Sequence, residues 1–71
     1  MQTSPYTPEI RLIRLPEVLN LTGLSRSAVY QRMAQDRFPR AVQLTWRAIV
    51  WRLGEVKAWI ESRPRTASHR A

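Results

Sequence analysis

The chain of 71 residues carries 12 lysine and arginine side chains against 5 aspartate and glutamate side chains, and its formal net charge is +7. This length accommodates one domain with a small hydrophobic core. The absence of cysteine excludes a disulfide framework and a thiolate metal site. The sequence shows neither an apolar run long enough to span a membrane nor a signal peptide, so we expect a cytoplasmic protein with no membrane partner.

The positive charge is almost entirely arginine, because Lys57 is the only lysine. Arginine presents a planar fork of N–H donors that matches phosphates and guanine edges, whereas lysine presents a point charge. A small arginine-rich domain therefore indicates a nucleic-acid partner. Charge alone leaves two alternatives open, a merely soluble basic protein and a peptide that binds a membrane surface.

The first part of the chain contains no strong helical signal. Residues 1–9 include prolines, serine and threonine without periodicity, and we expect a flexible N-terminal arm there. Residues 10–15, with the sequence IRLIRL, favour a short extended segment, because the residue before Pro16 avoids the α region. We expect Leu12 and Leu15 to point inward.

Residues 15–37 predict two short helices joined by a tight turn. Pro16 suits the first position of a helix, where no N–H is needed. Gly23 falls where that helix must stop, since glycine adopts a left-handed conformation without a Cβ penalty. Ser25 can then cap the next helix by accepting a hydrogen bond from a free backbone N–H. A helix, a glycine turn and a capped helix are typical of a helix-turn-helix.

The second helix is expected over residues 26–35. With Val29 at the centre of its buried face, the helical period of 3.6 residues places Met33 on the same side. Four side chains are thereby left outside the core. Ser27 and Gln31 point away from it, and Arg26 and Tyr30 lie on one shoulder of the helix. Pro39 prevents the helix from continuing.

The remaining chain changes character. Two short runs that favour β-structure, residues 41–44 and 48–51, flank Thr45-Trp46-Arg47 and predict a β-hairpin. Residues 53–63 predict a third helix, because apolar side chains recur there at helical spacing. The expected fold is mainly α with a small β-hairpin, a winged helix-turn-helix over residues 10–63. Residues 64–71 are expected to be a disordered basic tail.

The three tryptophans have different expected positions. Trp51 and Trp59 are expected in the core, where they would link the hairpin to the third helix. Trp46 falls in the predicted loop, where a large aromatic side chain is unusual. It could fold back onto the hairpin, but we favour a contact with DNA or with a neighbouring protomer.

Catalytic chemistry has no support in the sequence. His69, the only histidine, lies in the tail, and no nucleophile has a histidine partner within a predicted element. Neither a metal-ligand spacing nor a glycine-rich phosphate loop is present. We therefore expect no enzyme activity, no cofactor and no small-molecule substrate.

The candidate DNA-binding residues surround the second predicted helix. The start of a recognition helix reaches base edges in the major groove, so Arg26 could read guanine and Gln31 could read adenine. Serine and tyrosine side chains more often bind phosphates. The full set is Ser25, Arg26, Ser27, Tyr30, Gln31, Arg37 and Arg47, in which Arg47 lies at the hairpin tip. Arg40, like Arg37, is a candidate phosphate ligand.

Three segments resemble the AlpA family of prophage regulatory proteins: RLIRLPEVLNLTGLSRSAVYQRM, RFPRAVQL and RAIVWRLGEVKAWIESR. The resemblance covers residues 11–63 in a consistent order. It implies a winged-helix DNA-binding protein related to phage excisionases and to the DNA-binding domain of MerR-type regulators. It places Ser25, Arg26, Ser27 and Tyr30 in the recognition helix and Arg47 in the wing. Asp36 stands where the family often has a glycine.

The resemblance implies a transcriptional regulator of a prophage or mobile element that binds double-stranded DNA. One alternative is an excisionase-type factor that bends DNA at attachment sites. Another is a protein–protein interaction module that does not bind DNA. Because one such module buries only about 600–1,000 Å² on DNA, a homo-oligomer or a cooperative assembly on repeated sites is a further hypothesis.

Overall fold

A computed structural model describes residues 10–65, and the structured part of the chain consists of three helices and a three-stranded antiparallel sheet. In chain order the elements are β1 (Leu12–Ile13), α1 (Leu15–Thr22), α2 (Arg26–Ala34), β2 (Val42–Gln43), β3 (Ile49–Arg52) and α3 (Leu53–Glu61). The predicted winged helix-turn-helix is confirmed. The predicted arm, residues 1–9, and residues 66–71 of the predicted tail lie outside the described residues.

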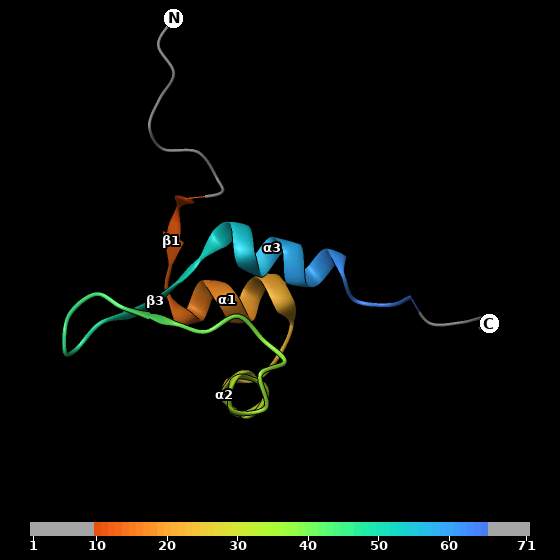
Figure 1. The fold of residues 1–71 in the computed structure, drawn as a ribbon, viewed down its shortest axis with the longest axis horizontal. Helices are drawn as coiled ribbons and strands as arrows, with labels where there is room; N and C mark the ends of the chain where they lie inside the picture. The colour runs from red at the N-terminus through yellow and green to blue at the C-terminus, as the bar shows by residue number, and fades with distance from the viewer. Residues whose placement is uncertain (1–9, 66–71) are drawn as a thin grey trace, which may run out of the picture.

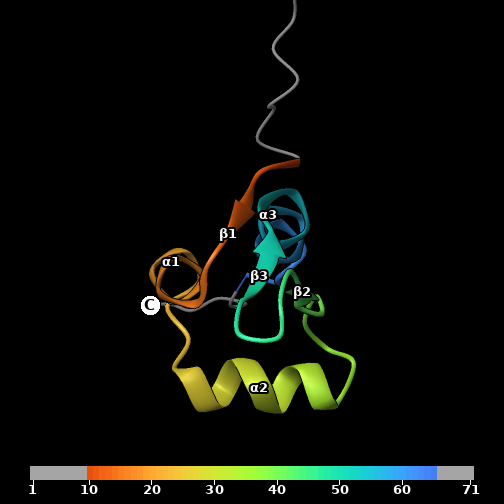
Figure 2. The ribbon, with the colours of Figure 1, turned by 90° about the vertical axis from the view of Figure 1, so that its left-hand side faces the viewer.

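The elements are arranged with α2 on one side of the domain and α3 on the other. Figure 1 shows α2 end-on below α1 and α3, while the hairpin formed by β2 and β3 projects sideways from the body. Figure 2, turned by 90°, shows α2 lengthwise beneath the hairpin. The hairpin therefore extends across the direction of the α2 axis.

The core draws one buried side chain from β1, from β3, from each helix and from the segment after α2. Its buried cluster consists of Ile13 from β1, Val18 from α1, Val29 from α2, Phe38 from the segment after α2, Trp51 from β3 and Val56 from α3. All six are at most 5% exposed. Because no element can bury its apolar face alone in so small a domain, α2 depends on this shared core through Val29.

The sheet differs from the sequence prediction in one strand and one side chain. Strand β1 joins the predicted hairpin, so the strand order is β1-β3-β2. Ile13 lies opposite Trp51 and is buried, whereas Leu12 lies opposite Arg52 and is 41% exposed. The prediction that Leu12 points inward was wrong, because successive side chains of a strand alternate between its faces and β3 sets which face is covered.

The turn of the helix-turn-helix follows the predicted local chemistry. Gly23 has a φ of 77°, and its N–H donates to the carbonyl oxygen of Leu19 at 2.8 Å. The hydroxyl of Thr22 donates to the Val18 carbonyl and accepts from the backbone N–H of Leu24. These contacts end α1 and fix the direction in which the chain enters α2.

Candidate nucleic-acid interface

Helix α2 begins at the predicted serine cap. The Oγ atom of Ser25 accepts a hydrogen bond of 3.2 Å from the backbone N–H of Ala28, and Ser25 has the extended backbone of an N-cap residue. The Oγ atom of Ser27 lies 3.4 Å from that of Ser25. Two hydroxyl groups and the free N–H groups of the first turn therefore face outward at the same end of α2.

One face of α2 is open to solvent. Val29 is the only fully buried side chain of the helix, and Met33 is half-buried against the core. The exposed side chains include Ser27 and Gln31, which the helical period directs outward, and Arg26 in the first turn. Figure 2 shows α2 along one edge of the domain.

The N-terminal end of α2 carries a charge that is unfavourable for the isolated helix. The helix contains no aspartate or glutamate, and its first residue is Arg26. The N-terminal end of a helix carries partial positive charge, so a cation there is unfavourable and an anion is favourable. An arginine beside a serine cap and free N–H groups suits a phosphate ligand better than it suits the isolated helix.

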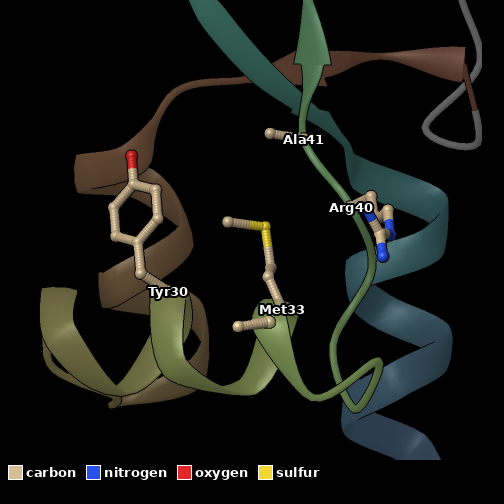
Figure 3. A pocket seen from close by; sticks show the side chains of 5 residues that line it. Tyr30, Met33, Arg40 and Ala41 are labelled. Atoms are coloured by element: carbon tan, nitrogen blue, oxygen red, sulfur yellow. The ribbon is translucent and has the colours of Figure 1, made fainter.

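Tyr30 lies on the shoulder of α2 rather than on its outer face. Its ring meets Trp51 edge to face, with the centroids 6.5 Å apart and the planes at 71°. It lines an open hollow of about 370 Å³, whose other walls are formed by Met33, Ala34, Arg40 and Ala41. Figure 3 shows the Tyr30 ring and Met33 rising from α2, with Arg40 and Ala41 on the opposite wall. The hollow separates α2 from the strand that leads to the wing.

The segment that leaves α2 is held by two tryptophans. The indole N–H of Trp59 donates to the carbonyl oxygen of Arg37 at 2.8 Å, and the indole N–H of Trp51 donates to that of Pro39 at 3.2 Å. Between these carbonyls, Phe38 is buried and meets the Trp59 ring edge to face at 4.8 Å. The exposed side chain of Arg37 is therefore attached to a fixed backbone.

Asp36 is both strained and paired. Its φ of 59° makes it the only residue other than glycine with a positive φ in the described part of the chain. Its carboxylate accepts a hydrogen bond of 2.8 Å from Arg40, and both side chains are about three-quarters exposed. An exposed pair of this kind contributes little to stability, so a phosphate can compete with Asp36 for the Arg40 guanidinium.

The hairpin tip is an ordered turn that carries an aromatic and a cation. The Oγ1 atom of Thr45 accepts hydrogen bonds from the backbone N–H groups of Arg47 and Ala48 at 3.2 and 3.1 Å. The Arg47 guanidinium lies 4.5 Å from the centroid of the Trp46 ring, and Trp46 is 79% exposed. Trp51 and Trp59 instead pack against the domain, in agreement with their expected positions.

The structure brings the predicted DNA-binding residues to three places. Ser27 and Gln31 lie on the outer side of α2, Ser25 caps its start, and Arg26 and Tyr30 lie on one shoulder; Arg37 follows the helix, and Arg47 lies at the hairpin tip. Sequence reasoning missed the hydrogen bonds of Trp51 and Trp59. Their acceptors lie 12 and 22 residues away in sequence, and no local signal identifies such pairs.

Within residues 10–65 no three metal-binding side chains are grouped as they would be around an ion. In the same residues no helix has the length and apolar character required to cross a bilayer.

Comparison with known proteins identifies relatives over most of the chain. Residues 11–64 match the family model described as Prophage CP4-57 regulatory protein (AlpA). The chain is also 39% identical over 59 residues to the uncharacterized protein ORF88 of Enterobacteria phage P4, and this match covers 83% of the chain and 67% of the relative.

Proposed function

Because the chain belongs to the AlpA family of prophage regulatory proteins, we propose that it is a sequence-specific regulator that binds double-stranded DNA. In this proposal α2 enters the major groove and the β2–β3 hairpin contacts the flanking backbone. The family is described as regulatory rather than enzymatic. A protein that binds the DNA of a prophage would act in the cytoplasm.

The observation that carries the proposal is the exposed face of α2, which contains no aspartate or glutamate. A helix that existed only to pack on the core would gain from an acidic residue in its first turn. Helix α2 has Arg26 there, and its exposed side chains are neutral or cationic with no carboxylate among them. In a helix-turn-helix, the N-terminal residues of the second helix are the ones that reach base edges.

The contacts divide into two proposed classes. Arg26 and Gln31 would read bases, since guanidinium and amide groups form bidentate pairs with guanine and adenine. Five side chains would bind phosphates and set the register of the protein without reading sequence: Ser25, Ser27, Tyr30, Arg37 and Arg47.

A selection of bound fragments from a random duplex pool tests the proposal. We expect enrichment of one motif, and the enriched duplex should bind more tightly than its scrambled version at the same salt concentration. Failure to retain any duplex in moderate salt would refute DNA binding and favour the protein–protein alternative. A promoter fusion carrying the selected site would then show regulation of transcription.

The proposed assembly state follows from interface size. A single module of this type buries about 600–1,000 Å² of protein surface, which is small for a specific DNA complex. We therefore expect several copies on repeated sites, or a dimer. Sedimentation with and without the selected duplex tests this expectation, and tight binding of one protein to one site would contradict it.

A further inference from the structure

Trp46 is the most exposed large apolar side chain among the described residues. It is 79% exposed, whereas the other exposed apolar side chains range from 39% to 55%. The guanidinium of Arg47 lies over one face of its ring, 4.5 Å from the centroid, and the ring does not belong to the hydrophobic core cluster. A side chain with this exposure loses contact with water only when a partner covers it.

The turn that carries Trp46 has a hydrogen-bonded backbone before any partner binds. Thr45 accepts two backbone hydrogen bonds through its hydroxyl, and the N–H of Leu44 donates to the Ala48 carbonyl at 2.9 Å across the loop. These hydrogen bonds hold the backbone of the loop in the free protein. A pre-ordered aromatic tip loses less conformational entropy on binding than a mobile one.

The charge around the tip favours a nucleic-acid partner over a protein surface. No aspartate or glutamate occurs between residues 37 and 54. Arg47 accompanies the indole at the tip. Arg40 and Arg52 on the same stretch of chain are instead ion-paired with Asp36 and Glu55. An apolar ring next to a cation matches the minor groove, where the sugar walls and base edges are flanked by phosphates.

We propose that Trp46 is a wedge that inserts into the minor groove beside the α2 site and partly unstacks one base step, so that the protein bends its DNA. This inference rests on the proposed DNA binding by α2. The hairpin projects across the α2 axis (Figures 1 and 2). With α2 in the major groove, the proposal places the hairpin tip in the adjacent minor groove. Arg47 would bind a phosphate at the groove edge.

The wedge predicts a sequence preference at a position that forms no hydrogen bond with the protein. Pyrimidine–purine steps such as TA and CA unstack most readily, so a selected site should carry one of them where the hairpin lies. Selection with Trp46→Ala should lose that step and keep the bases read by α2. Trp46→Phe should retain both, because phenylalanine is also an effective wedge.

The test uses the full chain and the selected duplex with a fluorophore at each end. Fluorescence anisotropy measures binding, and energy transfer between the ends measures bending at saturating protein. We expect the wild type and Trp46→Phe to shorten the end-to-end distance, while Trp46→Ala binds within about tenfold of the wild type and leaves the duplex nearly straight. Leu44→Ala, which removes a half-exposed apolar side chain from the same hairpin, is the control and should bend DNA normally.

The outcomes separate the two proposals. No anisotropy change with the wild type would refute both DNA binding and the wedge. Binding with a straight duplex, or equal bending by the wild type and Trp46→Ala, would refute the wedge alone. Loss of cooperative binding in Trp46→Ala with bending unchanged would assign the side chain to a second copy of the chain and would also overturn the wedge.

Discussion

The indole N–H of Trp59 in α3 donates a hydrogen bond of 2.8 Å to the carbonyl oxygen of Arg37, immediately beyond the end of α2. This bond joins the last helix to the exit of the helix proposed to read DNA. Together with the bond from Trp51 to Pro39, it attaches the segment that leaves α2 to β3 and α3.

Trp59→Phe should separate the hydrogen bond from the packing. Phenylalanine keeps an aromatic ring against Phe38 but has no N–H, so we expect a loss of about 1 kcal/mol in the free energy of unfolding. Affinity for the selected duplex should also fall, because the end of α2 is less well positioned. Urea unfolding and anisotropy measure the two effects. Trp46→Phe is the control for stability and should unfold like the wild type.

Gly23→Ala should cost about 1 kcal/mol through the backbone alone. The added Cβ would meet no atom within 4 Å, so the cost arises from the φ of 77° and not from a clash. Gly23→Asn should be milder, since asparagine tolerates the left-handed region better than alanine. Equal destabilisation by the two variants in thermal unfolding would argue against this explanation.

Asp36→Asn should strengthen DNA binding without a large change in stability. The substitution removes a negative charge beside Arg37 and releases Arg40 from an exposed ion pair that contributes about 0–1 kcal/mol. Asp36→Ala should bind DNA similarly but unfold more readily, because alanine is strained at a φ of 59°. Anisotropy at low salt and urea unfolding, performed on both variants, test the two statements.

Arg26→Ala should change stability and binding in opposite directions. Removing a cation from the N-terminal end of α2 should stabilise the free protein by about 0.3–1 kcal/mol. The same change should weaken binding to the selected duplex by about 1–3 kcal/mol and relax the preference at one base pair. If the variant loses affinity equally for all sequences, Arg26 binds phosphate and does not read a base.

Arg47→Ala should weaken binding to all duplexes alike. If Arg47 binds a phosphate, its removal should reduce the slope of log K against log salt concentration by about 1. Titrations at several salt concentrations, on both the selected and the scrambled duplex, measure this slope. An unchanged slope would show that Arg47 acts only by supporting the Trp46 ring.

The features that the sequence predicted correctly depend on short-range chemistry. The glycine that ends α1, the serine that caps α2 and the burial of Val29 each follow from neighbours within one or two helical turns. The orientation of β1 could not be predicted in this way, because both Leu12 and Ile13 are apolar and only pairing with β3 shows which is covered. The indole hydrogen bonds were missed for the same reason, since both ends must be placed by the fold.

Strand β3 is the middle strand of the sheet and continues into α3 without a loop, since Arg52 ends one and Leu53 begins the other. If β3 unfolded, β1, β2 and α3 would all lose the strand that they share as a neighbour. The helix-turn-helix is therefore not separable as a fragment, and unfolding should be all-or-none. In hydrogen exchange, the β3 amides that pair with β1 and β2 should exchange together, at the rate set by global unfolding.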